Sequence, residues 1–466
     1  MEKKYDVIVI GSGGGTKIIT PAARRGLKVA CIDKGPLGGT CLNRGCIPSK
    51  MLIHPADVTH YIQDAPKFDI ISHTNFRVDF EKLIRRISYT VDRDSAGIAA
   101  GYDRNPNIDS YNASARFLSD KVIEVAGHQL TADKIFIAVG ARPRIPDIAG
   151  LEGTPYMTST EALRNMNMPR NMVVVGAGYI AAELGYAYGA LGAAVHFLVR
   201  SKFLRSEDSQ IAEEFSRIFS QRFSVHFSTV PTEVKYNNQQ FTVSYKDRMG
   251  RVLALTTDAL LIATGVVPNT DTLALENTNI ARQENGFIKV DNRLQTTVDG
   301  IYALGDCVGN YLYRHSVNFE GEYLFRTVFD KPSNEPIQYP PMPHAIFTRP
   351  QVAGVGKTED QLKEEGVDYV VGINPYTKSA MGMAMLSEYG FCKILIDRKS
   401  RRILGGHIIG DEASNMIHMI IAFMNKEGTL DDLLNMIYIH PALPEIVRNA
   451  ARNAKTNLEA AAKKPA

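Results

Sequence analysis

Two segments of the chain repeat one pattern of hydrophobic and polar positions. The first begins with the apolar run Tyr5–Ile10 and the second with Asn171–Val175; each continues into a glycine-rich turn and an alanine-rich helical stretch. A short apolar run bounded by glycine is typical of a buried strand in a parallel sheet. Each segment therefore predicts a βαβ nucleotide-binding unit, and the repeat predicts two doubly wound domains rather than one.

Clusters of proline and glycine divide the rest of the chain, at 141–150, 265–270 and 337–343. Beyond the last cluster, residues 392–396 alternate like a strand and residues 413–426 are helix-like. We expect an α/β protein with two Rossmann-like, doubly wound nucleotide-binding domains and a C-terminal α+β domain. The predicted boundaries are 1–150, 151–270, 271–336 for a central segment that completes the first site, and 337–466.

Composition narrows the class of protein. The chain has 466 residues, a formal net charge of +3, 44% hydrophobic and 22% charged residues, as in a globular protein. A charge so near balance, without a basic run, predicts no nucleic-acid or membrane partner. No apolar stretch approaches the ~20 residues of a membrane span, and the apolar run near Met1 is too short for a signal peptide. Five cysteines are few for a secreted disulfide scaffold, so we expect a cytoplasmic location.

The first glycine-rich turn contains Gly11, Gly13 and Gly14. Glycines let the backbone turn tightly and approach a pyrophosphate at a helix N-terminus. Asp33 follows Gly13 by 20 positions, where a carboxylate can accept hydrogen bonds from a ribose. Thr16 takes the place of the usual third glycine, so the motif is imperfect. A tight turn in an unrelated α/β protein is the alternative.

The second turn contains Gly176 and Gly178, with Ala181 as an allowed third small residue. The strand that follows ends at Arg200, with Arg205 nearby, instead of at an acid. Positive charge at this point suits the 2′-phosphate of NADPH better than NADH. The competing interpretation is a solvated basic loop. Two dinucleotide sites in one chain suggest one tightly held redox cofactor and one exchanging nucleotide.

The most specific signal is Cys41 and Cys46, with four residues between them and Pro48 just beyond. Proline favours the first turn of a helix, and a thiol near a helix N-terminus has a lowered pKa. A zinc site would need further grouped ligands, which the other cysteines do not provide, so we predict no metal. Two buried, inert cysteines are the remaining alternative. We predict a redox-active pair.

The segment 39–50, with its Cys41 and Cys46, resembles the redox motif of the class I flavoprotein pyridine nucleotide-disulfide oxidoreductases, which include dihydrolipoamide dehydrogenase and mycothione reductase. The resemblance extends over the chain, through the strand ends at 138–140 and 263–265, the segment 300–306 and the ending 439–445. It implies FAD and NADPH or NADH as cofactors, a C-terminal dimerisation domain, and a homodimer with active sites shared between subunits.

The resemblance also implies roles for single residues. Cys46 would lie nearest the flavin and Cys41 would exchange with a small disulfide or dithiol substrate. Lys50 would lie by the flavin and pair with Glu183, and Tyr179 would cover the nicotinamide pocket. The implied nucleotide-binding residues are Gly11, Gly13, Gly14, Asp33, Lys34, Thr40, Lys50, Ala115, Gly140, Asp306, Gly176, Gly178, Tyr179, Ile180, Arg200, Arg205 and Gly265.

Thiol–disulfide exchange needs a thiolate attacker and a protonated leaving thiol, and a histidine can serve both. His440 has this role in the resemblance, oriented by Glu445 and acting on the cysteines of the other subunit. From spacing alone, a loop histidine would be the better interpretation. No cysteine follows Cys392, which argues against the mercuric and large thioredoxin reductases.

The substrate stays open at this point. Pro21 and Glu322 stand where glutathione reductase has carboxylate-binding arginines, which disfavours glutathione. Residues 311–322 look closer to mycothione reductase or dihydrolipoamide dehydrogenase, and Arg200 favours an NADPH-consuming reductase. A flavin-dependent NAD(P)H oxidase or quinone reductase on the same fold is the alternative from another class, because it would not need the thiol pair together with His440.

Overall fold

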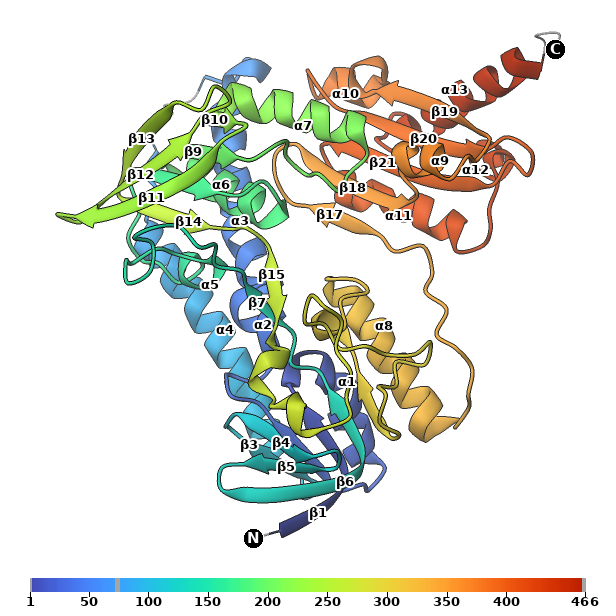
Figure 1. The fold of residues 1–466 in the computed structure, drawn as a ribbon. Helices are drawn as coiled ribbons and strands as arrows, with labels where there is room; N and C mark the ends of the chain where they lie inside the picture. Colours follow the sequence, from blue (N-terminus) through green and yellow to red (C-terminus); the bar gives the residue numbers. More distant parts are fainter. Residues whose placement is uncertain (1, 72–75, 463–466) are drawn as a thin grey trace.

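The computed structural model describes residues 2–71 and 76–462. A lower unit with the N-terminus at its tip supports two further units that lie beside each other above it (Figure 1). Each unit is built on its own sheet, and the sheets carry the two predicted βαβ segments and the predicted C-terminal domain. None of the helices in the described ranges is long and apolar enough to cross a membrane.

The sheet of the lower unit is parallel at its centre, as its apolar strands predict. Its first strand pairs in parallel with β2 and with β6, and a hairpin of two antiparallel strands extends the far edge. The strands in order are β3 (Ile108–Tyr111), β2 (Val29–Ile32), β1 (Glu2–Ile10), β6 (His128–Ile137), β5 (Val122–Val125) and β4 (Ala115–Ser119). The helices are α1 (Ser12–Arg24), α2 (Gly39–Arg44), α3 (Cys46–Asp64) and α4 (Phe80–Asp103).

A late part of the chain returns to this first sheet. Strand β16 (Ile301–Ala303) pairs in parallel with β6, and its three residues are buried. Helix α8 (Arg314–Phe325) follows and lies beside α1 (Figure 1). Because the pairing joins residues far apart in sequence, it places Asp306 at the carboxyl edge of the first sheet.

The second unit repeats the parallel arrangement. Its sheet has the order β10 (Ser224–Phe227), β9 (Ala194–Val199), β8 (Asn171–Val175) and β14 (Ala259–Ile262), all parallel. A three-stranded antiparallel sheet is attached, made of β11 (Val230–Asn237), β12 (Gln240–Lys246) and β13 (Val252–Thr257). The helices are α5 (Ser159–Ala162), α6 (Tyr179–Leu191) and α7 (Ser209–Arg222). Two short antiparallel strands, β7 (Ala141–Pro143) and β15 (Val266–Pro268), connect this unit to the first.

The third unit is an antiparallel sheet with helices, as expected for an α+β domain. The strand order is β17 (His344–Ile346), β18 (Gln351–Gly356), β21 (Ile403–Gly410), β20 (Phe391–Asp397) and β19 (Tyr369–Pro375). The helices are α9 (Glu359–Glu364), α10 (Ala380–Ala384), α11 (Ala413–Met424), α12 (Leu430–Asn435) and α13 (Glu445–Ala462). The helix predicted at 413–426 is α11, which ends two residues earlier.

The alternating strand predicted at 392–396 is a strand but does not expose its polar position. All five residues are buried, including Lys393, which is 1% exposed. The Lys393 ammonium donates to both carboxylate oxygens of Asp208 at 2.9 Å and to Glu359 at 2.5 Å. The two carboxylates compensate for the burial of the charge, so the lysine fixes the third unit to the second.

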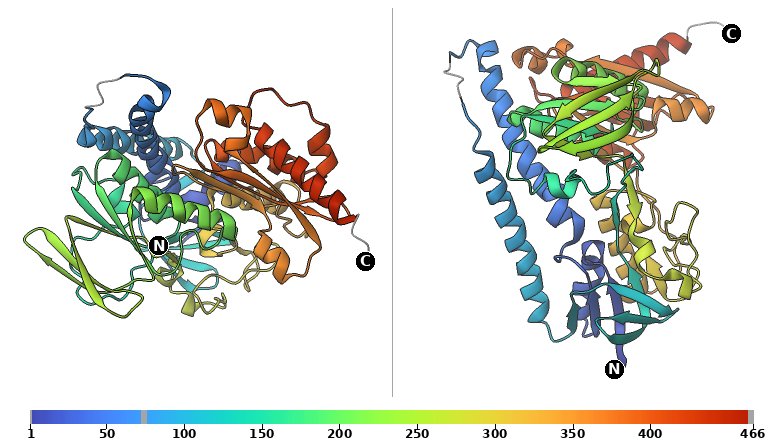
Figure 2. Two further views of the ribbon diagram at one scale, coloured as in Figure 1. Left: turned by 90° about the horizontal axis from the view of Figure 1, so that it is seen from above. Right: turned by 60° about the vertical axis from the view of Figure 1, so that its left-hand side comes forward.

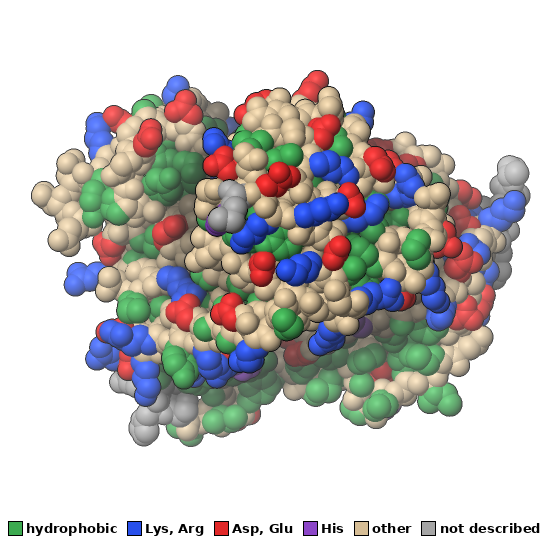
Figure 3. All heavy atoms as spheres, turned by 90° about the horizontal axis from the view of Figure 1, so that it is seen from below, with side chains coloured by type: hydrophobic (Ala, Val, Ile, Leu, Met, Phe, Trp, Pro, Cys, Tyr) green, Lys and Arg blue, Asp and Glu red, His purple; other side chains and the backbone are tan. Residues whose placement is uncertain are grey.

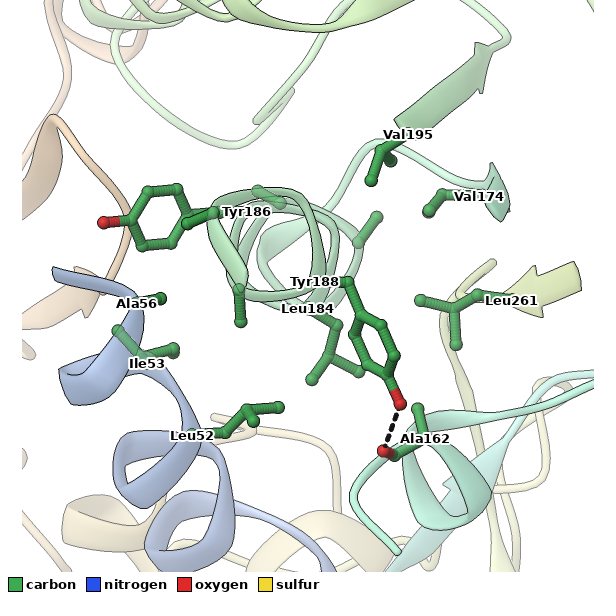
Figure 4. Close-up of a cluster of buried hydrophobic side chains, with 14 of the residues drawn as sticks. Leu52, Ile53, Ala56, Ala162, Val174, Leu184, Tyr186, Tyr188, Val195 and Leu261 are labelled. Atoms are coloured by element: carbon green, nitrogen blue, oxygen red, sulfur yellow. Dashed lines mark hydrogen bonds between the residues drawn. The ribbon is translucent and has the colours of Figure 1, made fainter. Parts of the chain in front are cut away.

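Helices α3 and α6 join the first two units through one hydrophobic cluster (Figure 4). Leu52, Ile53 and Ala56 of α3 face Leu184 and its neighbours on α6, with apolar residues of the second sheet behind them. Polar contacts accompany the packing, since Thr59 donates to the carbonyl of Ala190 at 3.0 Å. Successive contacts between the two helices lie at increasing residue numbers in both. The helices therefore run parallel, with their N-termini at the same end.

Helices α3 and α4 form a long hairpin along one side of the molecule (Figure 2). On the face shown in Figure 3, basic and acidic side chains are interspersed, in keeping with the formal net charge of +3.

Candidate active site

One large cavity lies where the three units meet. It has a volume of about 2480 Å³ and is lined by residues of both βαβ turns, of α2, α3 and α8, and of β17. The predicted residues that line it are Gly11, Gly13, Gly14, Asp33, Lys34, Thr40, Cys41, Cys46, Lys50, Ala115, Gly140, Gly176, Gly178, Tyr179, Ile180, Glu183, Arg200, Arg205, Gly265 and Asp306. His440 and Glu445 are not among the described residues that line it.

The first glycine of each turn has a positive φ and lies close to a carbonyl oxygen. Gly11 has φ +101°, and a Cβ there would lie 2.2 Å from the carbonyl oxygen of Ala138. Gly176 has φ +140°, and its Cβ would lie 2.2 Å from the carbonyl oxygen of Ala263. Only glycine tolerates this conformation and this close approach. The first turn therefore lies directly against the strand end at 138–140, and the second against the strand end at 263–265. Both positions are at the carboxyl edge of a sheet, where such sheets bind ligands.

The first turn accommodates Thr16 because other glycines supply the close packing. A Cβ at Gly15 would lie 2.5 Å from a methyl group of Val9, so this glycine lets α1 approach β1. A Cβ at Gly39 would lie 2.5 Å from the Cα of Gly13, so α2 begins directly against the turn. The Thr16 hydroxyl donates to the carbonyl of Gly13 at 2.9 Å. The replacement of the third glycine therefore leaves the turn intact.

Asp33 is held in place beside the first turn. One carboxylate oxygen accepts hydrogen bonds from the backbone N–H and hydroxyl of Ser12 at 2.8 and 2.6 Å, and the other accepts from the N–H of Gly35 at 3.0 Å. Each carboxylate oxygen can accept more than one bond, so the oriented group keeps capacity for a ribose hydroxyl.

Asp306, shortly after β16, and Arg314, at the start of α8, both line the cavity. Burial raises the pKa of the Asp306 carboxyl to about 6, while the positive charge of Arg314 lowers it. Arg314 is the first residue of α8, and its guanidinium lies 3.9 Å from a Cβ built on Gly13. The sequence did not single out Arg314, because an arginine at a helix start has no local signature.

The two thiols are brought together by a tight joint between two helices. Cys41 lies in α2, Cys46 is the first residue of α3, and Gly45 joins them. A Cβ at Gly45 would lie 2.9 Å from the carbonyl oxygen of Thr40. Glycine at this position therefore permits the turn that places Cys46 within hydrogen-bonding reach of Cys41.

The surroundings shift the pKa values of the two thiols in opposite directions. The Cys41 hydrogen bond lowers the pKa of Cys46 to about 7, assisted by the charge of Lys50 against the opposing effect of burial. For Cys41, the hydrogen bond to Cys46 and burial both raise the pKa above its usual range. At neutral pH the pair therefore holds a proton on Cys41 and a substantial thiolate fraction on Cys46.

Lys50 and Glu183 pair across the junction of α3 and α6. The ammonium nitrogen lies 2.8 and 3.0 Å from the two carboxylate oxygens, and the N–H of Phe347 donates to Glu183 at 3.0 Å. Burial raises the pKa of Glu183, and Lys50 opposes this shift. Tyr179 begins the same helix α6 and keeps 41% of its surface exposed.

Arg200 and Arg205 lie in the loop that follows β9 and both line the cavity. The N–H of Leu204, in the same loop, donates to the carbonyl of Ala177 at 2.9 Å. The basic loop is thus attached to the second glycine turn and places positive charge beside it.

His440 and Glu445 form a pair away from the cavity. The Nδ1 of His440 lies 3.1 Å from both carboxylate oxygens of Glu445, and the peptide bond between His440 and Pro441 is cis. Burial raises the pKa of Glu445, but hydrogen bonds from Ala442 and His440 and the charge of Arg448 lower it overall. Glu445 is 5% exposed and His440 is 70% exposed, so the imidazole is presented outward.

The other three cysteines are buried. Burial raises the pKa of Cys31 and Cys307 to about 12, which makes them poor nucleophiles. Within residues 2–71 and 76–462, no group of three or more His, Cys, Asp or Glu side chains is placed to hold a metal ion.

The fold and the thiol site define a class of flavin-dependent oxidoreductase, and comparison with known proteins agrees. Residues 5–322 match the model of the pyridine nucleotide-disulphide oxidoreductases, and residues 342–451 match the dimerisation domain of the same proteins. The chain belongs to the pyridine nucleotide-disulphide oxidoreductase family. It is an FAD-dependent enzyme that uses a nicotinamide nucleotide, as the sequence predicted.

Individual relatives are similar over nearly their whole length. Mycothione reductase of Mycobacterium tuberculosis is 35% identical, over 96% of this chain and 98% of the relative. Dihydrolipoyl dehydrogenase of Cupriavidus necator is 32% identical, over 97% and 98%. The solved structure of the HOCl-induced flavoprotein disulfide reductase RclA from Escherichia coli, a Cu(II) complex, has a TM-score of 0.86 and 27% identity, over 97% of this chain and 99% of that one.

Proposed function

We propose that this protein reduces the disulfide of a small thiol compound with electrons from NADPH, through Cys41 and Cys46. One observation carries the proposal: Cys41 and Cys46 lie in the same cavity as the Lys50–Glu183 pair, and their surroundings lower the pKa of Cys46 and raise that of Cys41. The similarity to mycothione reductase supports a low-molecular-weight disulfide, and the basic loop at Arg200 supports NADPH.

The residues around the first turn fit FAD. The contact between Gly13 and Gly39 leaves backbone surface free of side chains, Asp33 is oriented for a ribose, and Asp306 faces the cavity. We assign these residues, with Lys50, to holding the cofactor. When bound, FAD supplies two-electron transfer between the nicotinamide nucleotide and the cysteine pair.

The exchange steps follow from the difference between the two thiols. Cys41 loses its proton to a base and attacks one sulfur of the substrate disulfide, forming a mixed disulfide and releasing one substrate thiolate. That thiolate takes the proton back from the base. The Cys46 thiolate then attacks the sulfur of Cys41, which forms the Cys41–Cys46 disulfide and releases the second thiolate. This second thiolate takes a proton from solvent, because Cys46 carried none.

We assign the base to His440 of the partner subunit. Its outward presentation and its absence from the described residues lining its own cavity support action across a dimer, and the matched dimerisation domain supports the dimer itself. Glu445 would stabilise the protonated imidazole, as a carboxylate does in catalytic triads.

A second candidate is oxidation of dihydrolipoamide, which is the same path in reverse. Dihydrolipoyl dehydrogenases at 32% identity over the whole chain favour it. The cytoplasmic location expected from the few cysteines stays a prediction for either candidate.

Turnover of a small thiol disulfide with NADPH or NADH, and of dihydrolipoamide with NADP⁺ or NAD⁺, tests the proposal. We expect NADPH to support reduction of a small thiol disulfide, and Cys41→Ser to abolish it while dye reduction continues. Activity with NAD and dihydrolipoamide alone would favour the second candidate. Disulfide turnover by Cys41→Ser at the wild-type rate would contradict the thiol mechanism. Reduction of dyes or quinones by the wild-type enzyme without any disulfide turnover would favour an oxidase or quinone reductase.

Mixing two inactive variants tests the shared site. Cys41→Ser and His440→Ala each remove one half, and a mixed dimer contains one site with both halves intact if His440 acts across the interface. Random pairing would then restore about a quarter of wild-type activity. No recovery from a mixture shown to contain mixed dimers would contradict the shared site.

A further inference from the structure

A second histidine–glutamate pair lies inside the cavity. The Nε2 of His344 is 2.7 Å from a carboxylate oxygen of Glu207, and the two side chains are 19% and 6% exposed. The residues are 137 positions apart in sequence and come from different units of the fold. Unlike the His440–Glu445 pair, whose imidazole is exposed, this pair faces the same cavity as the basic loop and the Lys50–Glu183 pair.

Glu207 ends a loop that is anchored at both sides. The N–H of Glu207 donates to the carbonyl of Leu204, whose own N–H donates to Ala177 in the second glycine turn, both at 2.9 Å. The next residue, Asp208, is fully buried and is bound by Lys393 of the third unit. The carboxylate of Glu207 is therefore fixed relative to the turn and to the loop that bears Arg200.

His344 begins a strand whose other end contacts the Lys50–Glu183 pair. Strand β17 is three residues long, and Phe347 directly after it donates its N–H to Glu183 at 3.0 Å. The ring of Phe347 also lies 4.4 Å from the Lys50 ammonium. A single short strand thus contacts the basic loop at its start and the Lys50–Glu183 pair at its end.

The packing around His344 is specific to this arrangement. The ring of Tyr313 is stacked on His344, with centroids 6.1 Å apart and an angle of 11° between the planes. On the neighbouring strand β18, a Cβ at Gly354 would lie 2.9 Å from the Nε2 of His344 and 3.0 Å from the Nδ1 of His407. Gly354 therefore gives the imidazole the room to reach Glu207.

We propose that Glu207 and His344 form a latch that positions the nicotinamide nucleotide, by holding strand β17 against the loop of the second dinucleotide turn. This inference rests on the proposed function, since it takes the second turn as the nucleotide site. The latch sets the separation between the phosphate-binding loop and the Lys50–Glu183 pair, and a dinucleotide bound on the turn has to extend from one to the other. Glu207 and His344 are positioning residues, and neither exchanges a proton with the substrate.

Titration of the oxidised holoenzyme with NADP⁺ tests the latch without turnover. We expect Glu207→Gln and His344→Gln each to weaken NADP⁺ binding roughly tenfold, within the range typical of coupling between a structural element and a ligand. The double variant should bind no more weakly than either single variant, because the two residues act as one unit. In turnover, KM for NADPH should rise while kcat stays close to wild type, because the thiols and His440 are unchanged.

Glu365→Gln is the matched control, since it breaks an ion pair to Lys357 in the third unit at residues that do not line the cavity. Unchanged NADP⁺ affinity in the latch variants would overturn the proposal, even if their melting temperature fell, because that result describes a purely structural contact. If the single variants do not fold, the double variant, which keeps two neutral hydrogen-bonding groups, decides in the same way. Failure of the wild-type enzyme to bind either NADP⁺ or NAD⁺ would instead contradict the proposed function.

Discussion

The ammonium of Lys50 contacts both carboxylate oxygens of Glu183, at 2.8 and 3.0 Å, and so joins the first turns of two parallel helices. Lys50 is one turn along α3 from Cys46, and Glu183 is one turn along α6 from Tyr179. The pair therefore connects the thiol side of the cavity with the side that carries the second dinucleotide turn. Hydrophobic packing of α3 on α6 fixes its geometry (Figure 4).

Removal of Lys50 should destabilise the protein in a pH-dependent way. Burial already raises the pKa of Glu183, and Lys50→Met would raise it further by removing the compensating charge. A carboxyl with a raised folded-state pKa favours folding at low pH, and this contribution is lost as pH rises through that pKa. We expect the free energy of unfolding to fall by about 1–3 kcal/mol, a modest loss because Lys50 is partly exposed. The loss should be larger at pH 8 than at pH 5, because Glu183 is ionised at the higher pH. Urea unfolding at both pH values measures it.

Lys50→Met with Glu183→Gln is the control, because no buried charge remains to titrate. Its stability should vary with pH much as wild type does. Equal pH dependence in the single and double variants would show that Glu183 is not the responsible group.

The reduced enzyme should react with iodoacetamide at a rate that rises with a midpoint near pH 7, the pKa of Cys46. The thiolate is the reactive form, so the rate increases as pH rises through that value. Cys41→Ala should move the midpoint upward, because the Cys41 hydrogen bond is the largest influence that lowers this pKa. Cys392→Ser serves as control, since Cys392 is buried far from reagent. A midpoint that does not move in Cys41→Ala would contradict the assigned cause.

The features that the sequence predicted are local or repeated. The glycine turns, the flanking strands and the Cys41–Cys46 joint are each specified within a few residues, and the α+β character of the C-terminal part follows from periodicity. Residues such as Arg314 and the Glu207–His344 pair were missed because their neighbours come from distant segments. The burial of Lys393 could not be predicted for the same reason, because the carboxylate of Asp208 that compensates its charge comes from the second unit.

Arg314→Gln should raise the pKa of Cys46 and of Asp306. The charge of Arg314 lowers the pKa of both groups in the structure, although it is a smaller influence on Cys46 than Cys41 and Lys50. The iodoacetamide midpoint should therefore shift to higher pH, by less than in Cys41→Ala. FAD retention, measured from the absorbance ratio after dialysis, should fall if Arg314 also contributes to holding the cofactor.

Arg326→Gln is the matched control, since Arg326 directly follows the same helix and its side chain pairs with the exposed Glu335. Its midpoint and FAD content should match wild type. A midpoint in Arg314→Gln that equals the control would show that the guanidinium does not influence the thiols.

Arg200→Glu should reduce the preference for NADPH over NADH. Arg200 lines the cavity directly after β9, and the loop that follows is attached to the second glycine turn. A hydrogen bond between charged groups contributes about 1.5–3 kcal/mol, so NADP⁺ should bind at least roughly tenfold more weakly to the variant. NAD⁺ has no 2′-phosphate, and the new carboxylate can accept from its ribose, so its affinity should hold or improve. Titration of the oxidised holoenzyme with both nucleotides measures the change, with Arg217→Gln as control because Arg217 pairs with Glu214 at residues that do not line the cavity. Equal weakening for both nucleotides would mean that Arg200 contacts a group they share, and no change for either would make it a solvated surface charge.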